Sequence, residues 1–148
     1  MKCFKQKAIE MNKIKRITVF ILLTLTLGFG ADSISAQQIP AKLVQAFQEG
    51  DATALAPHFN ERFQLVLLGV DHRVSQPQAK EIMREFFKKY PPVSFEIIHK
   101  GDKKDSNFAV GKLKTKTETF RVNLFFKKVG EQNLLHLLEI EKDNGSSF

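Results

Sequence analysis

The sequence has one cysteine and no tryptophan, and the cysteine lies close to the start of the chain. Cys3 is the only thiol in 148 residues. A single thiol excludes an internal disulfide and a metal site built from several thiolates. A lipid anchor would need a cysteine just after the apolar run at residues 17–29, and none is there. The stability of the folded protein must therefore come from packing.

Sequence motifs for metals and nucleotides are also missing. No two of the four histidines have close metal-ligand spacing, and there is no His-Glu-x-x-His run or EF-hand-like acidic loop. Gly69, Gly111 and Gly130 are isolated, so no glycine-rich loop is present to bind a phosphate. We therefore predict no metal site and no cofactor.

The N-terminal segment has the pattern of an export signal. A basic front at residues 13–16 precedes thirteen mostly apolar residues at 17–29, and small residues follow at 33–36. A membrane-spanning helix needs roughly 20 apolar residues, so this run favours a cleaved signal over a permanent anchor. We predict a cleavable signal peptide at residues 1–36, cut near Ala36, and a periplasmic or secreted protein without a stable transmembrane anchor.

Two details of this signal stay open. Cleavage after Ser35 would place the small Ser33 three residues upstream of the cut, and translation from Met11 would give a more compact signal. Cleavage near residue 36 removes six of the 23 Lys and Arg and two of the 16 Asp and Glu, which leaves 17 against 14. The remaining charge of +3 gives little support to a nucleic-acid partner.

Helical spacing predicts two short helices and one longer helix. An apolar repeat follows Pro40 and ends at Gly50, and Asp51 is placed to cap a second short helix. Ser75 and Gln78 have the spacing of a capping box, which predicts the start of the longer helix. One apolar stripe follows this helix, made of Ala79, Ile82, Met83, Phe86, Phe87 and Tyr90.

Strand composition predominates in the rest of the chain. Residues 62–69 and 70–74 predict two short strands, and four more are expected near 93–100, 107–117, 119–128 and 134–142. The links between the last four are short enough for hairpins. Residues 37–148 therefore predict a single α+β domain, with N-terminal helices packed on a strongly curved, mainly antiparallel sheet.

The segment from Phe47 to Phe59 reads Phe-Gln-Glu-Gly-Asp-Ala-Thr-Ala-Leu-Ala-Pro-His-Phe. It resembles the opening of the nuclear transport factor two-like superfamily, in which a helix ends at Gly-Asp, a short helix carries a Leu and a Phe precedes the first strand. The later elements have a similar order over residues 39–142, and the chain is most similar to small exported bacterial proteins of unknown function. The resemblance implies a cystatin-like cone with an interior pocket, which hosts isomerases, dehydratases, cyclases and non-catalytic binders.

Strand alternation predicts which side chains face the helices. Those of residues 119–128 are Phe120, Val122, Leu124 and Phe126, and those of residues 134–142 are Leu134, His136, Leu138 and Ile140. His99 continues the face of Phe95 and Ile97. From this pattern we predict five ligand-binding residues in an interior pocket: His99, His136, Phe120, Leu124 and Tyr90.

These residues support a leading hypothesis and two others. The leading hypothesis is a non-catalytic domain that binds a small apolar ligand or an envelope protein. The alternative is a lyase-like or isomerase-like enzyme with His99 or His136 as general base, which requires both imidazoles to reach one open cavity. A homodimer through the sheet face is a third hypothesis, because Phe125, Leu135 and Leu137 are predicted to form an outward apolar patch.

Overall fold

The computed structural model describes residues 39–103 and 106–145. The predicted signal peptide, its cleavage site and the alternative start at Met11 lie outside these residues. Within the described ranges, no helix is long and apolar enough to span a bilayer.

Two α-helices and a 3-10 turn precede the first hairpin and one α-helix follows it, and the caps of the α-helices are those predicted. Helix α2 (Ala41–Glu49) ends at Gly50, which has a positive φ of 68°. Helix α3 (Ala52–Leu55) begins at Asp51, whose side chain accepts hydrogen bonds from Thr53 N at 2.9 Å and Ala54 N at 3.0 Å. A 3-10 turn, η1 (Ala56–His58), follows α3, and the capping box of Ser75 and Gln78 opens α4 (Gln76–Lys89).

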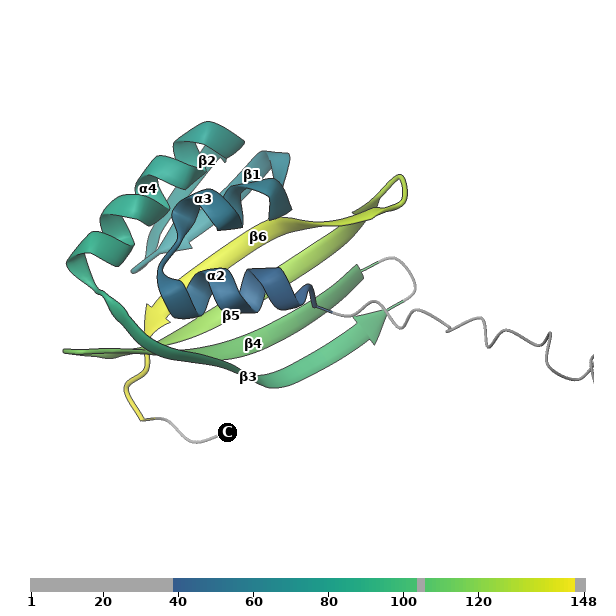
Figure 1. The fold of residues 1–148 in the computed structure, drawn as a ribbon. Helices are drawn as coiled ribbons and strands as arrows, with labels where there is room; N and C mark the ends of the chain where they lie inside the picture. Colours follow the sequence, from purple (N-terminus) through teal and green to yellow (C-terminus); the bar gives the residue numbers. More distant parts are fainter. Residues whose placement is uncertain (1–38, 104–105, 146–148) are drawn as a thin grey trace, which may run out of the picture. The chain divides into compact units, whose positions relative to one another are not determined.

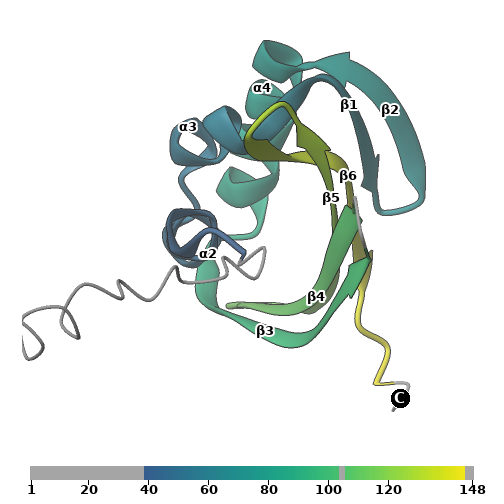
Figure 2. The same cartoon turned by 90° about the vertical axis from the view of Figure 1, so that its right-hand side faces the viewer.

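Six strands form one sheet in the order β2-β1-β6-β5-β4-β3. Their bounds are β1 (Phe59–Leu67), β2 (Val70–Ser75), β3 (Pro92–Lys103), β4 (Ser106–Thr115), β5 (Thr119–Val129) and β6 (Gln132–Lys142). All neighbouring strands are antiparallel except β1 and β6, which are parallel. The sheet is strongly curved and open, and the helices cover its concave face (Figures 1 and 2). The predicted fold class is confirmed.

Aromatic rings fill the space between the helices and the sheet. Phe47 of α2 stacks on Phe95 of β3 with ring centroids 4.6 Å apart, and Phe86 of α4 meets Phe120 of β5 edge-on at 5.3 Å. A Cβ added to Gly111 would lie 2.4 Å from the Phe95 ring, so this ring packs directly on the bare backbone of β4. The concave side of the sheet is therefore covered by the protein's own side chains.

The prediction that His136 faces the helices is wrong, because β6 contains a bulge at this residue. Phe125 pairs with Leu137 and Phe126 pairs with Leu135, so His136 is an extra residue with no partner on β5. Because one inserted residue reverses the alternation beyond it, Leu135 is fully buried and His136 is exposed. The prediction that Leu135 belongs to an outward apolar patch is wrong for the same reason.

A second bulge, in β3, moves His99 to the outer face of the sheet. Ile97 pairs with Gly111 and His99 pairs with Val110, which leaves Ile98 as the extra residue. His99 is exposed, and its ring centroid lies 5.7 Å from that of Phe108. The prediction that it continues the inward face of Ile97 is wrong.

Candidate functional site

The structure does not bring the five predicted ligand-binding residues together. Phe120 and Leu124 are fully buried and line none of five surface hollows among the described residues. Tyr90 lines a hollow beside α4, whereas His99 and His136 line two further, separate hollows. The shared cavity that the enzyme alternative requires is therefore missing among these five hollows.

An apolar groove lies between α4 and the turn that joins β1 to β2. Its volume is about 440 Å³, and it is lined by Leu67, Leu68, Ile82, Phe86 and Tyr90, together with the charged residues Glu81, Glu85 and Lys89. Apolar walls with a few charged groups are typical of sites that bind an apolar group and fix its orientation. Of the five predicted ligand-binding residues, only Tyr90 belongs to this groove.

Leu68 is held in an unfavourable conformation at the edge of the apolar groove. Leu67 pairs with Val70, so Leu68 and Gly69 form a two-residue hairpin turn, with φ of 52° and 83°. Leu68 is the only residue other than glycine with a positive φ in the part of the chain that the structure describes. This conformation costs a residue with a Cβ about 1–2 kcal/mol, and such turns favour Asn-Gly. A bulky, 39% exposed side chain here suggests a role other than stability.

A second hollow, of about 550 Å³, contains two arginines, and we call it the arginine hollow. It is lined by Glu61, Arg62, Phe63, Gln64, Arg73, Val74, Ser75 and His136. Of its lining residues, the sequence pattern predicts only His136 as a site residue, because the hollow depends on strand pairing. The sequence feature that indicates this hollow is the two-residue turn at Leu68-Gly69. This turn fixes the hairpin register and so places the two arginines on one face.

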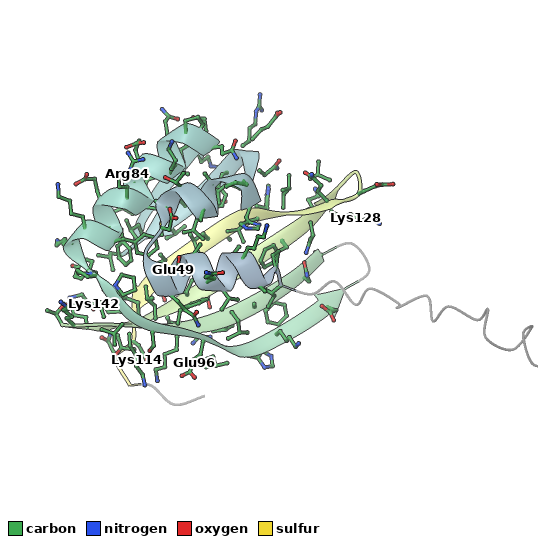
Figure 3. All side chains as sticks on the ribbon, viewed as in Figure 1. Glu49, Arg84, Glu96, Lys114, Lys128 and Lys142 are labelled. Carbon is green, nitrogen blue, oxygen red and sulfur yellow. The ribbon has the colours of Figure 1, made fainter. Side chains whose placement is uncertain are left out.

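Several charged groups outside the arginine hollow are paired. Lys142 donates to Glu118 at 2.8 Å, Arg84 pairs with Glu81, and Lys112 Nζ lies 3.2 Å from Asp143. The hydrogen bond from Lys112 is the main cause that lowers the pKa of Asp143. Figure 3 shows Arg84 on α4 and Lys142 at the end of β6.

The described residues contain no group of three or more His, Cys, Asp or Glu side chains that could hold a metal ion. His58 lies in η1, just before the start of β1. Partial burial lowers the pKa of His58, and the charge of Lys42 lowers it further. This histidine lines neither the apolar groove nor the arginine hollow.

The fold defines the class of the protein, because solved structures of low identity share it. A nuclear transport factor two-like protein of unknown function from Silicibacter pomeroyi is 14% identical with a TM-score of 0.53, over 68% of this chain and 87% of that one. A domain with a cystatin-like fold from Nostoc punctiforme is 10% identical with a TM-score of 0.56, over 68% and 70%. The chain thus has the nuclear transport factor two-like fold.

The chain belongs to the DUF4783 family, a domain of unknown function, which matches residues 40–141. A family protein from Bacteroides ovatus is 37% identical with a TM-score of 0.70, over 73% of this chain and 98% of that one. Another, from Bacteroides uniformis, is 30% identical with a TM-score of 0.68, over 71% and 97%. A comparison with curated proteins gave no match. The resemblance to the nuclear transport factor two-like superfamily and to bacterial proteins of unknown function is confirmed.

Proposed function

We propose that the chain is exported and acts as a non-catalytic binding domain, which takes an apolar group of a small ligand or of an envelope protein into the apolar groove. The observation that carries this proposal is the conformation and exposure of Leu68. The chain keeps a large apolar side chain in a strained and partly exposed turn, where Asn would be favoured. Contact between Leu68 and an apolar partner accounts for a leucine at this position.

The separation of the two exposed histidines favours binding over the enzyme alternative. A general base must lie within hydrogen-bond reach of the substrate, and a second group must orient it or stabilise the developing charge. His99 and His136 line different hollows, so they do not act on one bound molecule without a change in the fold. His136 also has no hydrogen-bond partner among the described residues that would orient its imidazole.

Binding in the groove is tested with Nile red, a neutral apolar fluorophore, and the Leu68→Asn variant. Asn tolerates the left-handed turn, so the fold is kept while the apolar side chain is lost. We expect the dissociation constant to rise about fivefold, since a half-exposed leucine contributes about 1 kcal/mol to an apolar contact. The matched control is Val129→Asn, which removes a 44% exposed apolar side chain near the β5–β6 turn. Equal affinities of all three proteins would contradict the proposal.

Export rests on the apolar run at residues 17–29 and its basic front. N-terminal sequencing of protein recovered from the cell envelope or medium tests it directly. We expect a chain that begins at Gln37 or Ala36. A chain that still contains Ile17, recovered from the cytoplasm, would contradict export.

A homodimer through the outer sheet face is a second candidate, and Phe125 supports it. This side chain is 39% exposed and stacks on Phe108 with centroids 6.4 Å apart, beside a hollow of about 490 Å³. The patch differs from the predicted one, because Leu135 is buried. Light scattering tests the candidate: we expect a dimer that the Phe125→Ser variant converts to a monomer. A wild-type monomer at high concentration would exclude it.

A further inference from the structure

We propose that the arginine hollow binds an anionic group, a carboxylate or a phosphate, through Arg62, Arg73 and His136. This inference does not depend on ligand binding in the apolar groove. It rests on three features of the described residues: the register that brings the two arginines together, the irregular pairing that opens the hollow, and the lack of ion pairs at its cationic side chains.

The antiparallel register places both arginines on the same face of the β1–β2 hairpin. Arg62 pairs with Ser75, and Gln64 pairs with Arg73. Residues two apart on a strand share a face, so Arg62 and Arg73 are diagonal neighbours on it. Diagonal neighbours have Cα atoms about 7–8 Å apart, within reach of two long side chains. Both guanidinium groups therefore reach one ligand without a change in the backbone.

The hollow lies where the pairing between β1 and β6 is irregular, beside these arginines. Phe59 pairs with Leu135 and Gln64 with Leu137, so five steps along β1 are matched by two steps along β6. His136 stands between the two paired residues of β6 and is also the extra residue of the bulge toward β5. Bulges re-aim side chains and are common beside binding sites. Here the bulge turns an imidazole, which can donate a hydrogen bond, toward the hollow.

The two arginines of the hollow have no ion-pair partner among the residues that the structure describes. Neither Arg62 nor Arg73 makes an ion pair or a side-chain hydrogen bond with another described residue. Glu61 is the only carboxylate that lines the hollow. The nearby Asp71 instead accepts a hydrogen bond from the Gln64 amide at 3.0 Å. The hollow therefore has an excess of positive charge that an anionic ligand would balance.

The chemistry of the donors defines the class of ligand. A guanidinium group presents a planar fork of N–H donors that matches two oxygens of a carboxylate or phosphate. With a volume of about 550 Å³, the hollow is large enough for the molecule that carries the anion, and not only for a bare ion. The source is a soluble metabolite or the headgroup of an anionic lipid, which share this chemistry.

Two-dimensional ¹H–¹⁵N NMR with inorganic phosphate, acetate and phosphatidylglycerol vesicles tests the inference on the whole exported protein. We expect at least one probe to give saturable changes at residues 61–64, 73–75 and 135–137. The Arg62→Gln and Arg73→Gln variants should each weaken that binding about tenfold or more, since hydrogen bonds to charged groups are strong. Their melting temperatures should match the wild type, because neither arginine makes an ion pair with a described residue.

Arg84→Gln is the matched control, because it makes the same change of charge on α4, outside the hollow. Binding of phosphate or acetate without vesicle binding would identify a soluble ligand, and vesicle binding lost in both hollow variants would identify a lipid headgroup. No saturable change with any probe would overturn the inference. An equal loss in Arg84→Gln would also overturn it, since that result reflects net charge alone.

Discussion

At residue 68, the backbone conformation decides which of two variants is the more stable. We compare Leu68→Ala with Leu68→Gly, two variants that both remove the apolar side chain. At an ordinary extended position, the Gly variant is less stable than the Ala variant by about 0.5–1 kcal/mol, because glycine loses more conformational freedom on folding. At a φ of 52°, the Cβ of alanine meets the following carbonyl oxygen, which costs about 1–2 kcal/mol.

The structure therefore predicts that the ordinary order of stability of the Ala and Gly variants is inverted at residue 68. Strain relief exceeds the entropic cost, so the Leu68→Gly variant should be more stable than Leu68→Ala by about 0.5–1 kcal/mol. For a domain of this size, that difference raises the melting temperature by roughly 2–6 °C. Urea unfolding and thermal unfolding both measure it.

Val70, two residues further on, provides the control pair. It lies in β2 with its side chain 56% exposed and has no positive φ. The Val70→Ala variant should be more stable than Val70→Gly, the ordinary order for a strand. If the pair at residue 68 shows the same order as the pair at residue 70, the left-handed turn and the argument for a retained Leu68 are both refuted.

Three further predictions concern packing, capping and pH. Gly111→Ala should lower the free energy of unfolding by about 1–3 kcal/mol in a urea titration, since its Cβ would overlap the Phe95 ring. The control is Gly130→Asn, which lies in open space at a φ of 63° and should have little effect in the same titration. Asp51→Ala removes two N-cap hydrogen bonds and should cost about 1 kcal/mol by thermal unfolding, with an unchanged midpoint counting against the cap. The pKa of His58 is lowered below 6.5 in the folded state, so the unfolded chain binds more protons at this residue. The contribution of His58 to stability is therefore complete above pH 6.5 and is lost as the pH falls through the folded-state pKa. The His58→Gln variant should reduce that loss in a pH series of unfolding curves.

Local chemistry made much of the fold predictable from the sequence. Gly50, Asp51 and the pair of Ser75 and Gln78 mark helix ends through hydrogen bonds within a few residues, so the sequence alone indicates them. The alternation of residues 119–128 also predicted the buried face of β5 correctly, because no bulged residue interrupts that strand.

The candidate sites were less predictable because they depend on bulges and on pairing between distant strands. The run Leu134-Leu135-His136-Leu137-Leu138 is apolar at four of its five positions, so either alternation buries leucines and the sequence does not reveal the bulge. The arginine hollow depends on the parallel pairing of β1 with β6, which are separated by five other elements along the chain. No short-range pattern reports such a pairing.

The central claim is that the exported domain binds an apolar group in the groove beside Leu68. Native mass spectrometry of the protein purified from the envelope of its own host tests this claim most directly, with the wild type and Leu68→Asn compared side by side. We predict a reproducible adduct, either a small apolar molecule or a partner protein, on the wild type and a clear loss of that adduct in the variant. An adduct of equal abundance in both proteins, or bare protein in both together with no Nile red binding, would contradict the claim.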